Sequence, residues 1–146
     1  MFMPNDAYSW NEKRIRILWS NQQAVFWIDV DDDRALPQLS QKADFEQLVA
    51  RYELKRIPDP YVKFSMTSPK SGSKAEEVQE KAWNAICLVV KVEPDIYQRR
   101  TRGKLFNLVL EQSGATKQTV YRWLRRYWQF GMCKNALSGR YDLCGG

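Results

Sequence analysis

The chain has 146 residues, of which 44% are hydrophobic, so it can build the packed core of one ordinary domain or of two small ones. It contains no histidine, and its three cysteines form no close pair, which excludes a zinc finger and a histidine-based catalytic triad. The net charge of +6 resides in the second half: residues 70–146 hold 14 Lys and Arg against 7 Asp and Glu, whereas residues 1–69 hold 9 against 10. A basic half favours a polyanionic partner, and a merely solvated basic surface is the alternative.

Neither secretion nor membrane insertion is expected. No stretch approaches 18 consecutive apolar residues, and the first residues lack a charged segment followed by a long apolar run. We therefore expect a cytoplasmic protein without a membrane partner, in which Cys87, Cys133 and Cys144 are reduced.

The first 65 residues predict a small α+β unit. Aromatic and β-branched residues dominate residues 14–19 and 24–30, and the polar run between them predicts a β-hairpin. A short amphipathic helix is expected next, and residues 54–57 can follow it as a strand before Pro58-Asp59-Pro60. The helix is indicated by the spacing of Phe45, Leu48, Val49 and Tyr52.

Four aspartates cluster after the predicted hairpin, at Asp29, Asp31, Asp32 and Asp33. Adjacent carboxylates repel each other and lack the spacing of a calcium loop, so a solvated turn is favoured over a metal site. We predict no metal site and no cofactor.

A domain boundary is predicted near residue 70, because residues 67–73 have the composition of a linker. This divides the chain into a small α+β unit at residues 1–69 and a helix-turn-helix domain at residues 70–146. Ser73 and Glu76 predict a capping box that opens a helix. Its apolar stripe consists of Val78, Ala82, Ala85, Ile86 and Val89.

Two further helices are expected at about residues 101–112 and 117–130, the first with Leu105, Leu108 and Val109 inward. Three helices suffice to bury a helix-turn-helix pair over its own core. Trp83 and Trp123 are accordingly predicted to pack in or beside this core rather than to stack on bases.

The turn between the last two helices carries the most specific signal. Gly114 can adopt the left-handed backbone conformation that ends a helix, and Thr116 can cap the next one. In that helix, one face consists of Val120, Leu124 and Tyr127, and another of Gln118, Arg122, Arg125 and Gln129. This is a helix-turn-helix layout, whose second helix enters the DNA major groove.

Roles follow from positions along the second helix. Gln118 suits adenine and Arg122 suits guanine, whereas Lys117, Arg125 and Arg126 suit phosphates. Basic residues also lie at the start of the preceding helix, where the backbone amides of the helix N-terminus favour a phosphate. Simple solvation of these basic side chains is an equally favoured alternative. The predicted DNA-binding set is Thr116, Lys117, Gln118, Thr119, Tyr121, Arg122, Arg125, Arg126, Arg100, Arg102 and Lys104.

A family resemblance rests on the run A-T-K-Q-T-V-Y-R-W-L-R-R-Y-W-Q-F-G at residues 115–131, followed by N-A-L at 135–137. It resembles the N-terminal DNA-binding region of the TnsB family. These are the DDE-type transposase subunits of heteromeric cut-and-paste transposons, including CRISPR-associated ones. The hairpin, the short helix and Asp59-Pro60-Tyr61-Val62 have spacings similar to that family's N-terminus, so the resemblance covers most of the chain.

The resemblance implies sequence-specific binding of double-stranded DNA at the ends of a bacterial transposon. It also implies partners, namely other transposase subunits and a regulatory ATPase, through regions outside this chain. The family's acidic triad lies downstream on a ribonuclease-H-like fold, so we predict no catalytic residue here and expect an N-terminal fragment without enzymatic activity. Two alternatives remain: a free-standing helix-turn-helix transcriptional regulator, and a protein-interaction module of the transposition complex.

Overall fold

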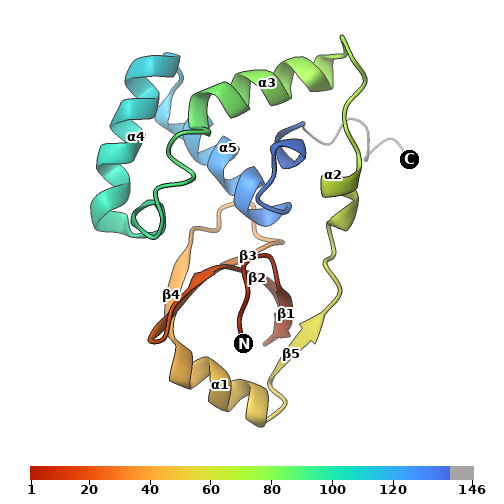
Figure 1. Cartoon of the computed structure of the whole chain (residues 1–146), viewed down its shortest axis with the longest axis vertical. Helices are drawn as coiled ribbons and strands as arrows, with labels where there is room; N and C mark the ends of the chain where they lie inside the picture. The colour runs from red at the N-terminus through yellow and green to blue at the C-terminus, as the bar shows by residue number, and fades with distance from the viewer. Residues whose placement is uncertain (139–146) are drawn as a thin grey trace. The chain divides into compact units, whose positions relative to one another are not determined.

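The structure is a computed structural model, and it describes residues 1–138. The chain divides into two compact units, Met1–Pro60 and Tyr61–Gly146. The first contains the strands and one helix, and the second contains the remaining helices (Figure 1). The predicted α+β class is confirmed. In the described part of the chain, no helix is long and apolar enough to cross a membrane.

Unit 1 is a five-stranded antiparallel sheet in the order β4-β3-β2-β1-β5. The predicted hairpin is confirmed as β2 (Lys13–Ser20) and β3 (Ala24–Asp29), with a register shift between Ile17 and Trp19. The predicted helix and the strand after it are confirmed as α1 (Lys42–Ala50) and β5 (Leu54–Ile57). The expected apolar face is narrower than predicted, because Val49 is exposed and Tyr52 lies exposed beyond the end of α1. Figure 1 shows the sheet curving, with α1 joining its two outer strands.

Two strands of unit 1 were not predicted. They are β1 (Ala7–Trp10) and β4 (Gln38–Gln41), each four residues long. The alternation of Tyr8, Ser9 and Trp10 was a signal for β1, since Tyr8 and Trp10 both pack on the core, whereas β4 has no such pattern. Strand β1 is inserted between β2 and β5, and β4 pairs with β3. Both short strands are completed by hydrogen bonds to their neighbours in the sheet.

Alternate residues of the sheet and the apolar face of α1 build the core of unit 1. The ring of Phe45 on α1 lies edge-on to those of Phe2 and Trp10, each with centroids 5.6 Å apart. Edge-to-face contacts of this kind add to the stability that burial itself provides. The buried cluster consists of Phe2, Tyr8, Ile15, Ile17, Val25, Trp27, Phe45 and Leu54.

The end of unit 1 is held by an ion pair. The side chain of Arg16 is fully buried and donates two hydrogen bonds to the Asp59 carboxylate, at 3.0 and 2.7 Å. Pro60 follows, and Tyr61 begins unit 2. The last residues of unit 1 are thus fastened to the middle of its sheet.

Unit 2 begins earlier than the linker composition indicated. The short helix α2 (Val62–Met66) places Phe64 flat against Phe130, with ring centroids 4.5 Å apart and an interplanar angle of 7°. Tyr61 contacts the same ring at 4.9 Å. The boundary at Pro60–Tyr61 therefore replaces the one expected near residue 70, because aromatic packing attaches the intervening residues to the helices.

The three predicted helices of unit 2 are confirmed as α3 (Lys74–Ile86), α4 (Arg99–Ser113) and α5 (Lys117–Gln129). Two 3-10 turns, η1 (Asp95–Tyr97) and η2 (Lys134–Leu137), precede α4 and follow α5. Helix α3 begins as predicted, since the Ser73 side chain accepts a hydrogen bond from the Glu76 amide. The expectation that Leu108 faces inward is wrong: Leu108 is 50% exposed, and Phe106 is buried instead.

Candidate nucleic-acid interface

The turn between α4 and α5 has the geometry that its sequence predicts (Figure 1). Gly114 has a φ of 69°, and its amide donates to the Leu110 carbonyl oxygen at 3.0 Å. The Thr116 hydroxyl accepts a hydrogen bond from the Thr119 amide at 3.2 Å. The left-handed glycine thus ends α4, and the threonine N-cap starts α5 within three residues. This short turn sets the angle between α4 and α5.

One face of α5 forms part of the core of unit 2. Val120 and Leu124 are fully buried, as predicted, and Trp123 is buried beside them. The half-buried Tyr127 stacks on Trp83 of α3, with ring centroids 6.1 Å apart. Both tryptophans therefore pack within the helices, as predicted.

The phenol of Tyr127 is shielded from water. Burial, together with the nearby negative charge of Glu93, raises its pKa to about 12. The Tyr127 hydroxyl is therefore neutral at physiological pH and adds no charge to α5.

The opposite face of α5 is basic. Lys117, Gln118 and Arg122 are exposed, whereas Arg125 and Arg126 are half-buried along the same side. Helix α5 contains no acidic residue, so its positive charges are not neutralised from within the helix. The first two turns of α5 therefore expose an amide and a guanidinium, flanked by further cations. These groups can donate hydrogen bonds to base edges and to phosphates.

Three predicted members of this face are placed differently. Tyr121 is half-buried, because its ring lies on Phe106 of α4 with centroids 4.2 Å apart. Thr119 is half-buried and shares a 2.9 Å contact between hydroxyl oxygens with Thr116. Gln129 was expected to extend the polar face but is buried. The exposed surface of α5 is thus concentrated in its first two turns.

The basic residues of α4 divide into two kinds. Arg100 and Lys104 are exposed, as a phosphate contact requires. The inclusion of Arg102 in the DNA-binding set is wrong: it is buried, and its Nη1 donates to the Tyr97 carbonyl oxygen at 3.3 Å. Arg102, Phe106 and Val109 follow the i, i+4, i+7 spacing of one helical face, a signal that would have placed Arg102 inward.

The cations at the start of β2 in unit 1 do not form a comparable basic face. Of the three cations near the start of β2, Arg16 is buried against Asp59, and Arg14 pairs with Asp31 at 2.7 Å. Only Lys13 of these three has no acidic partner in residues 1–138. These three side chains therefore do not form one free cationic edge.

The aspartate cluster of unit 1 forms a hydrogen-bonded turn. The Asp29 carboxylate accepts from the Asp31 amide, and the Asp32 carboxylate accepts from the Arg34 amide, each at 2.9 Å. With Asp31 paired to Arg14, these carboxylates satisfy backbone and guanidinium donors. Among residues 1–138, no three potential metal ligands gather at one point.

Comparison with known proteins matches both units. Residues 1–60 match the model of a TnsB N-terminal SH3-like domain, and residues 79–141 match that of a TnsB second domain. The first match ends where unit 1 ends. The chain is also 29% identical over 145 residues to the transposon Tn7 transposition protein TnsB of Escherichia coli. The aligned region covers 99% of this chain and 20% of the length of that relative.

Proposed function

Because this chain belongs to the TnsB family, in which it corresponds to the N-terminal SH3-like domain and the second domain, we propose that it binds double-stranded DNA sequence-specifically at transposon ends. The observation that carries this proposal is the helix-turn-helix formed by α4 and α5, whose second helix presents an acid-free basic face. A helix of about 10–12 Å diameter fits a major groove about 12 Å wide.

In this proposal, the first two turns of α5 read the bases. Gln118 donates to and accepts from an adenine edge, and Arg122 donates two hydrogen bonds to a guanine edge. Both side chains are exposed on the side of α5 opposite Val120 and Leu124, so neither is needed to hold the fold.

The remaining cations position the duplex. Lys117, Arg125 and Arg126 on α5 contact phosphates, and Arg100 and Lys104 on α4 contact the backbone beside the groove. The Thr116 and Thr119 hydroxyls lie at the helix N-terminus, where the amides and the helix dipole also favour a phosphate. Phosphate contacts set orientation and contribute affinity that carries no base identity.

Unit 1 has a supporting role in DNA binding. Residues 1–60 carry 8 basic and 10 acidic residues, and two arginines at the start of β2 are engaged by aspartates. Catalysis of DNA joining, and contacts with other transposase subunits and a regulatory ATPase, are assigned to regions of the full-length protein outside this chain.

The test is a titration of the 146-residue chain with two fluorescent duplexes at fixed salt. One duplex comes from the ends of the transposon that encodes the chain, and the other has the same composition in shuffled order. We expect tighter binding to the end duplex by a factor of about 10³ or more, and no cleavage or joining when magnesium is added. Equal affinities would contradict specific end binding, and a preference for palindromic sites over directly repeated ones would favour a transcriptional regulator.

A further inference from the structure

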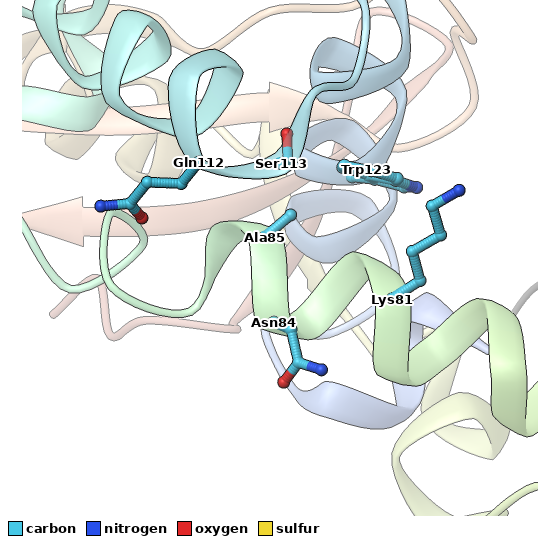
Figure 2. A pocket seen from close by; sticks show the side chains of 6 residues that line it. All are labelled: Lys81, Asn84, Ala85, Gln112, Ser113 and Trp123. Carbon is cyan, nitrogen blue, oxygen red and sulfur yellow. The ribbon is translucent and has the colours of Figure 1, made fainter.

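A pocket of about 240 Å³ opens between α3, α4 and α5 of unit 2 (Figure 2). Its walls come from the second half of α3, the end of α4 and the middle of α5. The lining residues are Lys81, Asn84, Ala85, Gln112, Ser113 and Trp123.

The chemistry of this pocket is that of an anion site. Lys81 supplies an ammonium, Asn84 and Gln112 supply amides, and Trp123 supplies an indole N–H, whereas no carboxylate lines the pocket. Within residues 1–138, none of these four side chains has a hydrogen-bond or ion-pair partner. The donors are therefore available to a ligand.

Two of the donors are directed to one side of the pocket. Figure 2 shows the indole nitrogen of Trp123 and the ammonium of Lys81 pointing to the same side, whereas the amides of Asn84 and Gln112 point in other directions. The Trp123 side chain is 6% exposed, so core packing fixes the direction of its N–H before any ligand arrives. An oxyanion between the indole and the ammonium would satisfy both groups, and the indole donor is already oriented for it.

The pocket also has a defined position beside α5. Trp123 follows Thr119 by four residues and precedes Arg126 by three, so all three lie along one flank of the helix, next to the basic face. On the other flank, Tyr121 rests on Phe106 of α4, the helix that carries the exposed Arg100 and Lys104. A helix in a major groove has one phosphate backbone on each side.

We propose that this pocket binds a phosphate of the DNA backbone, on the strand opposite the one approached by α4. Lys81 and Trp123 are the ligands. The proposal rests on the proposed DNA binding and deepens it. With the contact from α3, the helices of unit 2 contact the phosphate backbones on both sides of the major groove.

The first test measures the slope of log affinity against log salt for the end duplex. A lysine that neutralises one phosphate contributes about 0.9 to this slope, so Lys81→Ala should reduce the slope by that amount and bind about eightfold more weakly at 0.1 M salt. Lys81→Arg retains the charge and should retain the slope. The matched control is Lys91→Ala, which removes one charge from an exposed lysine outside the pocket and should change neither quantity to this extent.

The second test removes only the indole donor. Trp123→Phe keeps an aromatic ring in the core and should weaken binding several-fold without changing the salt slope, since the charge of the chain is unchanged. Circular dichroism and thermal unfolding check that the variant folds. If Trp123→Phe does not fold, the variants of Lys81, whose side chain is exposed, test the phosphate pocket instead.

The third test locates the phosphate. Duplexes that each carry one neutral methylphosphonate are titrated with the unmodified chain and with Lys81→Ala. At the contacted position, the neutral group should weaken binding by the unmodified chain and leave binding by Lys81→Ala unaffected, because both changes remove the same interaction.

The outcomes separate this proposal from the one on which it rests. If the unmodified chain does not distinguish end DNA from shuffled DNA, end binding itself fails. If it does, but Lys81→Ala and Trp123→Phe bind DNA like the unmodified chain, the phosphate pocket is refuted. Unchanged DNA binding by Lys81→Ala and Trp123→Phe would instead be expected if the pocket accepts an acidic side chain of a protein partner.

Discussion

The ring of Tyr121, on the reading helix α5, lies on the ring of Phe106, on the preceding helix α4, with centroids 4.2 Å apart and an interplanar angle of 49°. Phe106 is buried and Tyr121 is half-buried, so the pair connects the core of unit 2 to the edge of its basic face. The angle between α4 and α5 is therefore held by side-chain packing as well as by the turn.

Tyr121→Ala should destabilise unit 2 by about 2 kcal/mol, because it removes a half-buried ring and an aromatic pair. Tyr121→Phe keeps that ring and should leave the free energy of unfolding nearly unchanged. Urea denaturation of both variants measures the difference. Identical midpoints for the alanine and phenylalanine variants would show that the ring contact does not contribute.

Replacement of both Gln118 and Arg122 by alanine should weaken binding to the end duplex by about 1–3 kcal/mol for each hydrogen-bonded base that the variant no longer reads. Because these hydrogen bonds carry base identity, binding to shuffled DNA should fall less. Competitive titration of the two duplexes measures this ratio. Equal reductions in affinity for both duplexes would reassign the two residues to the phosphate backbone.

Alanine substitutions at Lys117, Arg125 and Arg126 should act without regard to sequence. Each should reduce the slope of log affinity against log salt by about one, since each removes one neutralised phosphate. Titrations at several salt concentrations on end and shuffled duplexes provide the slopes. If all three slopes match that of the unmodified chain, the basic face of α5 is only solvated.

Arg102→Ala should behave unlike these substitutions, although Arg102 lies among the exposed basic residues of α4 in the sequence. Its side chain is buried and donates to the Tyr97 carbonyl oxygen, so its removal leaves a cavity and removes this hydrogen bond. We expect the free energy of unfolding to fall by about 1–3 kcal/mol and the salt slope to stay unchanged. Arg100→Ala is the matched control, for which stability should be retained and the slope reduced.

Two glycines of the helix-turn-helix should respond to alanine with opposite signs. At Gly114 the φ of 69° is unfavourable for a residue with a Cβ, and Gly114→Ala should destabilise by about 1–2 kcal/mol. Gly103 lies within α4, and Gly103→Ala should stabilise by up to about 1 kcal/mol. An added Cβ meets no atom within 4 Å at either position, so backbone preference alone decides the sign. Thermal unfolding of the pair measures it, and shifts in the same direction would contradict the assignment.

Sequence by itself determined the features that depend on neighbouring residues. Gly114 and Thr116 specify the turn between α4 and α5 through backbone conformation and a local hydrogen bond. The spacing of Val120 and Leu124 identifies the buried face of α5. In the same way, the β-branched and aromatic residues of β2 and β3 predict the hairpin, because two long strands joined by a short loop pair with each other.

Only the tertiary structure decided the features that bring together residues far apart in the chain. Strands β1 and β4 exist because the sheet supplies their partners, and the stacking of Phe64 on Phe130 moves the domain boundary to Pro60–Tyr61. The pocket that joins Lys81 to Trp123 exists only when α3 packs beside α5, since neither residue lies near the other in sequence.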